Sequence, residues 1–281
     1  MIWTYLNNKF VPRDQVSISP FDRGFLFGDS IYEVIPVYDK KPFLVNEHLD
    51  RLLDNLDKVF IQDSIGKNKF IEVINELINR NGWNNQVVYI QVSRGSEYTR
   101  RHRPSINTAP TIFIYSSELS LNPYRDKSYG EGLNLISHQD LRWARCDIKT
   151  TSLMPNIFSI LNSNSNYDEV LLHNNKRITE SAAGSVFLVI GQSIIAPNLD
   201  NKILNSITRN HIKNLLKVMG LELEERDVFL DEISQAHEVW YISSTKELQP
   251  VATIDDIEIK YDKKNLIWHS VLTEYVQSIN L

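Results

Sequence analysis

The spacing of apolar residues predicts two amphipathic helices in the first third of the chain. The apolar positions of the first are Leu49, Leu52, Leu53, Leu56 and Phe60, on a helix that Asn46 opens. Those of the second are Phe70, Val73, Ile74, Leu77 and Ile78, on a helix over about 68–81 that Gly82 ends. Each set lies on one face of its helix, so both helices are expected to pack against a sheet.

Alternating apolar and polar residues predict that sheet. Residues 2–11 are typical of a hairpin with Asn7 and Asn8 at its tip, and residues 32–45 of a second hairpin that turns at 39–41. Pro36 confines its strand to an edge or a bulge, because proline has no backbone N–H to donate. Further strands are expected at 86–94 and 110–117.

The second half of the chain mixes strands and helices without a regular alternation, which predicts the α+β class. Strands are expected near 132–137, 169–173, 185–190, 193–196, 238–243 and 250–254, and helices near 154–166, 206–219 and 264–279. Ser206 can cap the 206–219 helix and Gly220 can end it, and an Asn/Ser run at 162–166 lies where the 154–166 helix would fray or end. A polar segment with proline and glycine separates the halves. It predicts a small N-terminal α/β domain over 1–120, a linker over 121–131 and a larger domain over 132–281.

Composition narrows the class of protein. The 281 residues are 42% hydrophobic and 23% charged, which is typical of a globular chain and not of a disordered or fibrous one. The net charge of −5 and the scattered basic residues give no electrostatic footprint for nucleic acid. No apolar run is long enough for a membrane span. The single cysteine, Cys146, excludes an internal disulfide, and the N-terminus has no secretory layout, so a cytoplasmic location is expected.

Several common sites are absent from the sequence. It has no G-x-G-x-x-G dinucleotide fingerprint, no P-loop and no G-x-S-x-G nucleophile turn. The seven histidines are dispersed and lack the H-E-x-x-H spacing, so no metal site is expected. The remaining candidates are a lysine, some acids, some hydroxyls beside a helix start, and the basic run Arg100, Arg101, His102 and Arg103.

Four segments, in order, resemble the fold-type IV pyridoxal-phosphate enzymes, the family of branched-chain aminotransferase, D-amino acid transaminase and aminodeoxychorismate lyase. They are "FDRGFLFGDSIYEVIPVYDKKPFLVNEHLDRL" (21–52), "RWARCDIKTTSLMPN" (142–156) with "ITESAAGSVFLV" (178–189), "ILNSITRNHI" (203–212) and "YISSTKELQPV" (241–251). The first and last are most similar to D-amino acid transaminase. The resemblance implies a two-domain fold-type IV enzyme whose C-terminal domain binds the cofactor.

The resemblance also implies roles for particular residues. Lys149 would bind pyridoxal 5′-phosphate as a Schiff base and then serve as general base and acid. Glu180 would pair with the pyridine nitrogen and keep it protonated. The residues implied in phosphate binding are Arg51, Ile207 and Thr208 through their backbone amides, and Ser244.

Substrate recognition is implied for Tyr32 and for an R-x-H pair, Arg100 and His102, which would bind the substrate carboxylate. The loop is about one residue longer than the family pattern, so Arg101 or Arg103 could take the role of Arg100. In the family this loop can reach the neighbouring subunit's site, which implies a homodimer.

The expected function is therefore ping-pong transamination between a D-amino acid such as D-alanine and a 2-oxo acid such as 2-oxoglutarate. The enzymatic alternatives are a branched-chain L-amino acid aminotransferase and aminodeoxychorismate lyase. The non-enzymatic alternative is an inactive scaffold that kept the fold. Retention of both Lys149 and Glu180 favours an enzyme, because a scaffold needs neither.

Overall fold

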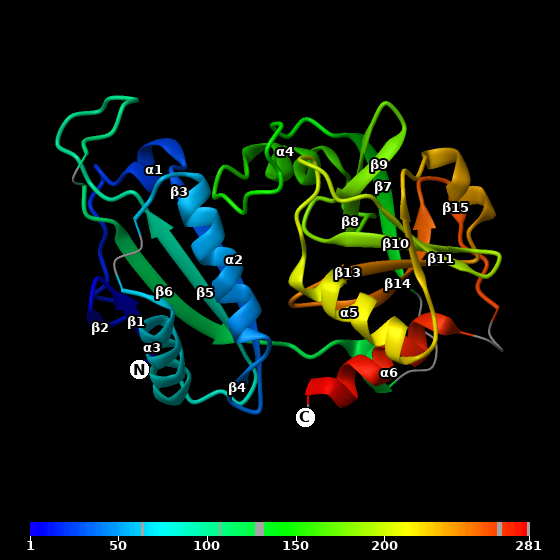
Figure 1. Ribbon diagram of the computed structural model, residues 1–281, viewed down its shortest axis with the longest axis horizontal. Coiled ribbons are helices and arrows are strands. Elements are labelled where there is room, and N and C mark those ends of the chain that lie inside the picture. Colours follow the sequence, from blue (N-terminus) through cyan, green and yellow to red (C-terminus); the bar gives the residue numbers. More distant parts are fainter. Residues whose placement is uncertain (63–64, 107, 127–131, 263–265, 280–281) are drawn as a thin grey trace. The chain divides into compact units, whose positions relative to one another are not determined.

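The structure is a computed structural model that describes residues 1–62, 65–106, 108–126, 132–262 and 266–279 (Figure 1). Contacts divide the chain into two compact units. Unit 1 comprises Met1–Ser120 and Ile148–Leu153, and unit 2 comprises Leu121–Asp147 and Met154–Leu281. Each unit has its own sheet with helices packed beside it, which confirms the α+β class. Part of the linker predicted over 121–131 lies outside the described residues.

Unit 1 contains a six-stranded sheet in the order β2-β1-β6-β5-β3-β4, with all neighbours antiparallel. The strands are β1 (Trp3–Leu6), β2 (Lys9–Pro12), β3 (Ser30–Tyr38), β4 (Lys41–Pro42), β5 (Gln86–Ser93) and β6 (Thr111–Glu118). Asn7 and Asn8 have φ of 44° and 69° and form the tip of the first hairpin, because asparagine tolerates this left-handed backbone. Since β4 is only two residues long, Pro36 lies in a strand with one largely open edge.

Helices α2 (Val45–Lys58) and α3 (Lys67–Arg80) cover one face of this sheet (Figure 1). Their buried apolar side chains form the core of unit 1 with those of β3 and β5. The expectation that Phe60 extends the α2 stripe is wrong, because the chain leaves the helix in a Schellman turn. Phe60 has φ 58° and is 87% exposed, and the Ile61 N–H bonds to the Leu56 carbonyl, so Ile61 enters the core instead.

Residues 148–153 return to unit 1 and extend along the open edge of β3. The Tyr32 N–H donates to the Lys149 carbonyl (3.0 Å), and the Thr151 N–H donates to the Ser30 carbonyl (3.1 Å). The short helix α1 (Arg23–Phe27), capped by the side chain of Asp22, lies just before the same end of β3. The backbone that carries Lys149 is therefore held by strand-like hydrogen bonds.

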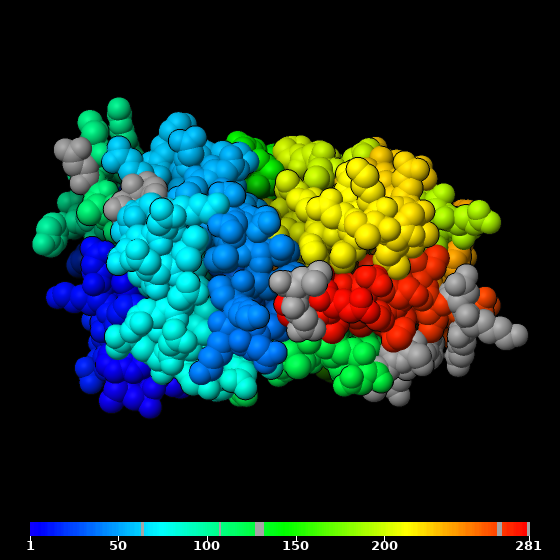
Figure 2. Space-filling view, turned by 60° about the horizontal axis from the view of Figure 1, so that its bottom comes forward, coloured from blue at the N-terminus to red at the C-terminus, as the bar shows by residue number. Residues whose placement is uncertain are grey.

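Unit 2 contains a nine-stranded mixed sheet, in which β7 is parallel to both β8 and β14 and β11 is parallel to β12. The strands are β7 (Leu133–Gln139), β8 (Glu169–Asn174), β9 (Arg177–Ser181), β10 (Ser185–Ile190), β11 (Ser193–Pro197), β12 (Leu223–Arg226), β13 (Glu238–Ser243), β14 (Glu247–Ile254) and β15 (Ile257–Glu258). The helices are α4 (Met154–Asn162), α5 (Ile207–Val218) and α6 (Ile267–Ile279), with 3-10 turns η1 (Pro123–Asp126) and η2 (Leu230–Gln235). Figure 2 shows α5 (yellow) and α6 (red) side by side, where His211 Nε2 and Ser278 Oγ are 2.8 Å apart.

The sequence prediction missed β9 and β12, which contain charged residues and lack a clear alternation. Helix α4 ends at Asn162, the first residue of the Asn/Ser run, and not at 166 as expected. Among the helices of the described residues, none combines the length and the apolar character that crossing a membrane requires.

Candidate active site

Lys149 lies partly buried against Tyr32 in unit 1. Its Nζ is 3.3 Å from the Tyr32 hydroxyl and 4.3 Å from the centre of the Tyr32 ring. The ring stacks on Tyr89 of the next strand, with centroids 5.8 Å apart. The structure thus brings together two of the predicted site residues, and it holds the amine beside an aromatic wall.

Tyr89 is the neutral side chain behind the Tyr32 ring. Burial, and then the nearby Tyr32, raise the pKa of Tyr89 above its ordinary value. Its hydroxyl donates to Gln91 Oε1 (2.8 Å), and Gln91 Nε2 donates to Ser30 Oγ (3.1 Å). A hydrogen-bonded row of neutral side chains therefore runs from the middle of the sheet to the strand end beside Lys149.

Arg51 belongs to a buried cluster behind β3. Glu33, which is completely buried, accepts from Arg51 Nε (2.6 Å) and Arg51 Nη2 (2.9 Å), and its Oε2 lies 2.9 Å from His48 Nδ1. Burial would raise the pKa of Glu33, but the charge of Arg51 and the hydrogen bonds of both partners outweigh it and lower the pKa far below the ordinary value. Burial lowers the pKa of His48, which favours the neutral imidazole. The cluster fixes the Arg51 guanidinium on α2.

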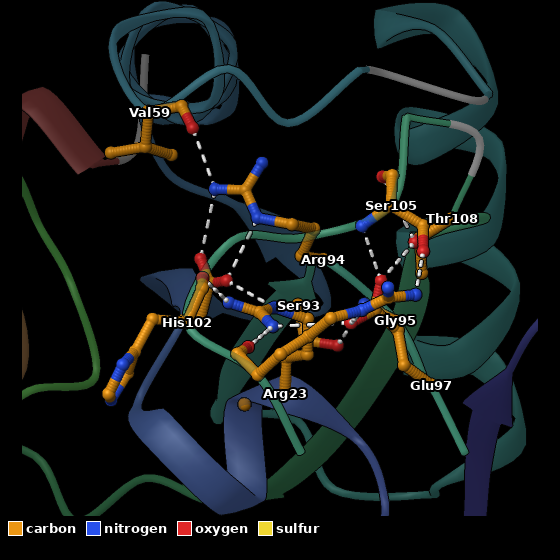
Figure 3. Close-up of polar contacts among 12 residues, drawn as sticks. Arg23, Val59, Ser93, Arg94, Gly95, Glu97, His102, Ser105 and Thr108 are labelled. Carbon is orange, nitrogen blue, oxygen red and sulfur yellow. Dashed lines mark hydrogen bonds and ion pairs between the residues drawn. The ribbon is translucent and has the colours of Figure 1, made fainter. Parts of the chain in front are cut away.

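Arg100 and His102 lie on the loop between β5 and β6. The Arg100 guanidinium carbon is 4.7 Å from the centre of the Phe27 ring, and the His102 ring centre is 5.8 Å from it. Arg23 binds the backbone of this loop through the carbonyls of Arg101 and His102 and also bonds to Glu97 (Figure 3). The two residues expected to bind the substrate carboxylate therefore contact the same phenylalanine.

Glu180 lies on β9 in unit 2, in a buried ion-pair network. Arg142 donates to Glu180 Oε1 and, through Nε and Nη2, to the two oxygens of Asp140 (3.0 and 2.8 Å). Burial would raise the pKa of Asp140, but Arg142 outweighs it, so the pKa lies below its ordinary value. Although burial opposes it, Asp140 and Glu180 raise the pKa of Arg142, which therefore stays charged. The Leu204 N–H donates to the other Glu180 oxygen (3.3 Å).

Thr208 and Ser244 bring two hydroxyls to the start of α5, with their Oγ atoms 3.3 Å apart. Ser206 caps this helix by accepting from the Arg209 N–H, as the sequence predicted. The amides of Ile207 and Thr208 lie in the first turn, where no intrahelical acceptor exists. Amides, hydroxyls and the positive end of the helix dipole together suit an anion.

Other buried polar groups were missed from the sequence. The hydroxyls of Ser181 and Ser185, which flank the turn after Glu180, are buried without a hydrogen-bond partner within the described part of the chain. Glu33, His48, Asp140 and Arg142 were also missed. An available signal was Glu33, an acid at the strand position that alternation assigns to the core.

In the described ranges, no group of three His, Cys, Asp or Glu side chains is placed to hold a metal ion. Cys146 is buried, and burial raises the pKa of its thiol to about 11, so it is not a reactive thiolate at neutral pH.

Comparison with known proteins covers nearly the whole chain. A family model described as amino-transferase class IV matches residues 30–254. A D-alanine aminotransferase of Listeria monocytogenes is 32% identical over 98% of this chain and 95% of that protein. The branched-chain amino acid aminotransferase of Escherichia coli gives a TM-score of 0.90 at 18% identity, covering 98% of this chain and 94% of that one. The branched-chain enzyme of Thermobaculum terrenum in its PLP form gives 0.85 at 20%, over 99% and 93%. This likeness confirms the fold that the sequence resemblance implied.

The Glu33 cluster yields a stability prediction. Glu33→Gln should lower the free energy of unfolding by about 3 kcal/mol, because it leaves the Arg51 charge buried without its partner. The pKa of Glu33 is lowered on folding, so its stabilising contribution is present above about pH 4.3, the ordinary pKa of glutamate, and is lost progressively below it. Urea unfolding at pH 7 and pH 3 should therefore show the difference from wild type shrinking in acid.

The matched control is Glu76→Gln, which breaks the exposed Arg80–Glu76 pair on α3 and should change stability by less than about 1 kcal/mol. Equal small effects from both substitutions would contradict the structural importance of the Glu33 cluster.

Proposed function

The chain belongs to the class IV aminotransferase family, and we propose that it is a pyridoxal 5′-phosphate-dependent aminotransferase acting on a D-amino acid and a 2-oxo acid. The observation that supports this reaction class is the position of the Lys149 amine, which lies beside Tyr32 on the edge of β3. The choice of a D-amino acid is supported by the full-length likeness to proteins named D-alanine aminotransferase and by the Arg100-x-His102 pair.

The side chains present fit this cofactor group by group. When bound, pyridoxal phosphate supplies an electron sink that stabilises negative charge at the substrate's α carbon. In this proposal Lys149 would hold the cofactor through its aldehyde group and would move the proton at the substrate's α carbon as general base and acid. The phosphate is bound by the Ile207 and Thr208 amides, the Ser244 hydroxyl and Arg51, all donors that suit an anion.

Glu180 would accept a hydrogen bond from the ring nitrogen in this proposal. Arg142, which pairs with both Asp140 and Glu180, determines the net charge of the carboxylates near this nitrogen. Asp140 and Glu180 share one guanidinium, so the ionised network keeps one net negative charge. A pyridinium would neutralise that charge in a setting with little solvent screening. Without Asp140, the guanidinium alone would cancel the charge of Glu180. The network therefore supports a protonated ring nitrogen.

The substrate carboxylate is bound, in this proposal, by Arg100 and His102 together with the Tyr32 hydroxyl. Tyr32 donates through a hydroxyl already fixed near Lys149, so the carboxylate and the amine of one substrate are recognised close together.

The cytoplasmic location expected from the sequence stays a prediction.

We also propose that the protein is a homodimer. Helix α4 exposes apolar side chains along its length, including Met154 (72%), Phe158 (52%) and Leu161 (76%). Monomeric proteins rarely expose such a continuous apolar surface, so a second copy is the proposed cover.

The substrate prediction is tested by an assay. D-alanine with 2-oxoglutarate should yield pyruvate in the presence of pyridoxal phosphate, and Lys149→Ala should abolish turnover because it removes the amine assigned to the cofactor. Pyruvate is measured by a coupled lactate dehydrogenase assay. Turnover restricted to L-leucine would favour the branched-chain enzyme, and pyruvate release from aminodeoxychorismate alone would favour the lyase. Failure to take up the cofactor at all would favour a scaffold.

The phosphate assignment predicts a selective loss of affinity. Ser244→Ala removes the hydroxyl assigned to the phosphate, so the dissociation constant for pyridoxal phosphate should rise about tenfold. The constant for pyridoxal, which lacks the phosphate, should not change. Both constants come from titration of tryptophan fluorescence, with exposed Ser270→Ala as the control. An equal loss for both aldehydes would instead indicate a general disturbance of the site.

The dimer proposal predicts a solution mass of about twice 32.6 kDa by size-exclusion chromatography with light scattering. Leu161→Glu should shift the protein to the monomer, because it places a charge in the apolar interface. Val218→Glu, on α5, makes the same change at a side chain that is 83% exposed and should have no effect. A wild-type monomer would refute the proposed dimer.

A further inference from the structure

The loop between β5 and β6 is held from below by Arg23, the first residue of α1, which is only 4% exposed. Its guanidinium donates to the carbonyls of Arg101 (2.7 Å) and His102 (3.0 Å) (Figure 3). The charge of Arg23 is matched by Asp29 (2.8 Å) and Glu97 (3.3 Å). One buried cation therefore fixes two consecutive peptide groups of the loop.

Glu97 closes the loop from its other side. Its carboxylate accepts from the Ser105 N–H and from the Thr108 hydroxyl (3.1 Å), which join the two arms of the loop (Figure 3). The hydrogen bond from the Ser105 amide is the main cause that lowers the pKa of Glu97 to about 2, although burial opposes it. The Glu97 carboxylate therefore stays ionised at neutral pH. Asp29 is shared with Arg94, which also donates to the Val59 carbonyl (2.8 Å) at the end of α2.

The side chains on this loop have different surroundings. Arg101 turns back on the loop, donating to Ser105 Oγ (2.8 Å) and lying 3.9 Å from Glu97. Arg100 instead lies over the Phe27 ring, whose other neighbours are Arg23 (4.7 Å) and the imidazole of His102 (5.8 Å). In the described ranges of the chain, Arg100 forms no ion pair with a carboxylate. Its charge and N–H groups can therefore meet an anion.

Phe27 is suited to hold these two groups. A guanidinium is attracted to the negative face of an aromatic ring, and the ring is too weak an acceptor to occupy its N–H donors. The backbone that carries the ring is fixed, because Phe27 ends α1 and Gly28 follows with φ 65°, the left-handed residue that closes the helix. A carboxylate in place of Phe27 would pair with Arg100 and prevent it from binding a substrate.

We propose that Phe27 is a positioning residue, whose ring holds Arg100 and His102 together as the carboxylate clamp while Arg101 serves only the loop. This inference rests on the proposed function and deepens it, because it selects Arg100 over Arg101. Arg23 and Glu97 supply the rigid backbone, and Phe27 sets the direction of the two side chains that leave it.

The kinetic test uses two phenylalanines of the same short helix. Phe27→Leu should raise the KM for D-alanine about tenfold with little change in kcat or in the affinity for pyridoxal phosphate, because only the orientation of the clamp is lost. Phe27→Tyr, which keeps the ring, should restore the wild-type KM. Phe25→Leu is the matched control, since Phe25 is 76% exposed. Arg100→Gln should raise KM at least as much as Phe27→Leu, and Arg101→Gln should not.

A KM for Phe27→Leu equal to that for Phe25→Leu, or an equal effect of Arg101→Gln and Arg100→Gln, overturns the inference. A raised KM together with a lower kcat, a lower cofactor affinity and a lower melting temperature would assign Phe27 a merely structural role. That result would also overturn the inference.

A second readout does not depend on turnover, so it separates this inference from the proposed function. The imidazole proton NMR signal of His102, identified by its loss in His102→Gln, should carry a ring-current shift from Phe27. The shift should disappear in Phe27→Leu and persist in Phe27→Tyr and Phe25→Leu. If wild type shows the shift but no turnover of D-alanine, the proposed function fails and the positioning role of Phe27 stands. If the signal is the same in all variants, the positioning role fails.

Discussion

A charge withdrawn from water must be paired, and this constraint organises the candidate site. Arg23, Arg51 and Arg142 have side chains only 5, 11 and 8% exposed, and each binds at least one carboxylate. Breaking such a buried pair costs about 3–5 kcal/mol, much more than an exposed pair contributes. Each pair therefore fixes the relative position of the elements that supply it: α1 with the β5–β6 loop, α2 with β3, and the segment after β7 with β9.

These pairs lie directly beside the residues to which the proposed function assigns chemistry. Glu33 follows Tyr32 in β3, so the strand that presents the Tyr32 hydroxyl to Lys149 on one face is anchored through Arg51 on the other. Arg23 fixes the backbone below Arg100 and His102. Pairing thus provides rigidity where a reaction needs groups held within a fraction of an ångström, and no flexible surface charge could supply it.

Local patterns predicted most of the secondary structure, because the residues concerned contain the relevant information themselves. The stripe of α5, its Ser206 cap and its Gly220 end are local features, and the structure contains that helix with its cap. Strand β9 was missed because Arg177–Ser181 is polar although it is mostly buried. Its burial reflects pairing with β8 and the Arg142 network, neither of which nearby residues encode. The expectation for Phe60 was wrong because the Schellman turn at the end of α2 places Ile61, and not Phe60, in the core.

The supporting residues of the site follow the same division between local and tertiary information. Glu33 alone was detectable, since the alternation of β3 places it between Ile31 and Ile35 on the core face. A buried acid requires a cation, and the helix that follows offers His48 and Arg51 three residues apart on one side. Phe27 gave no comparable signal, because an apolar residue in a short helix needs no partner. Its contacts with Arg100 and His102 join positions more than 70 residues apart, and only the folded loop brings them together.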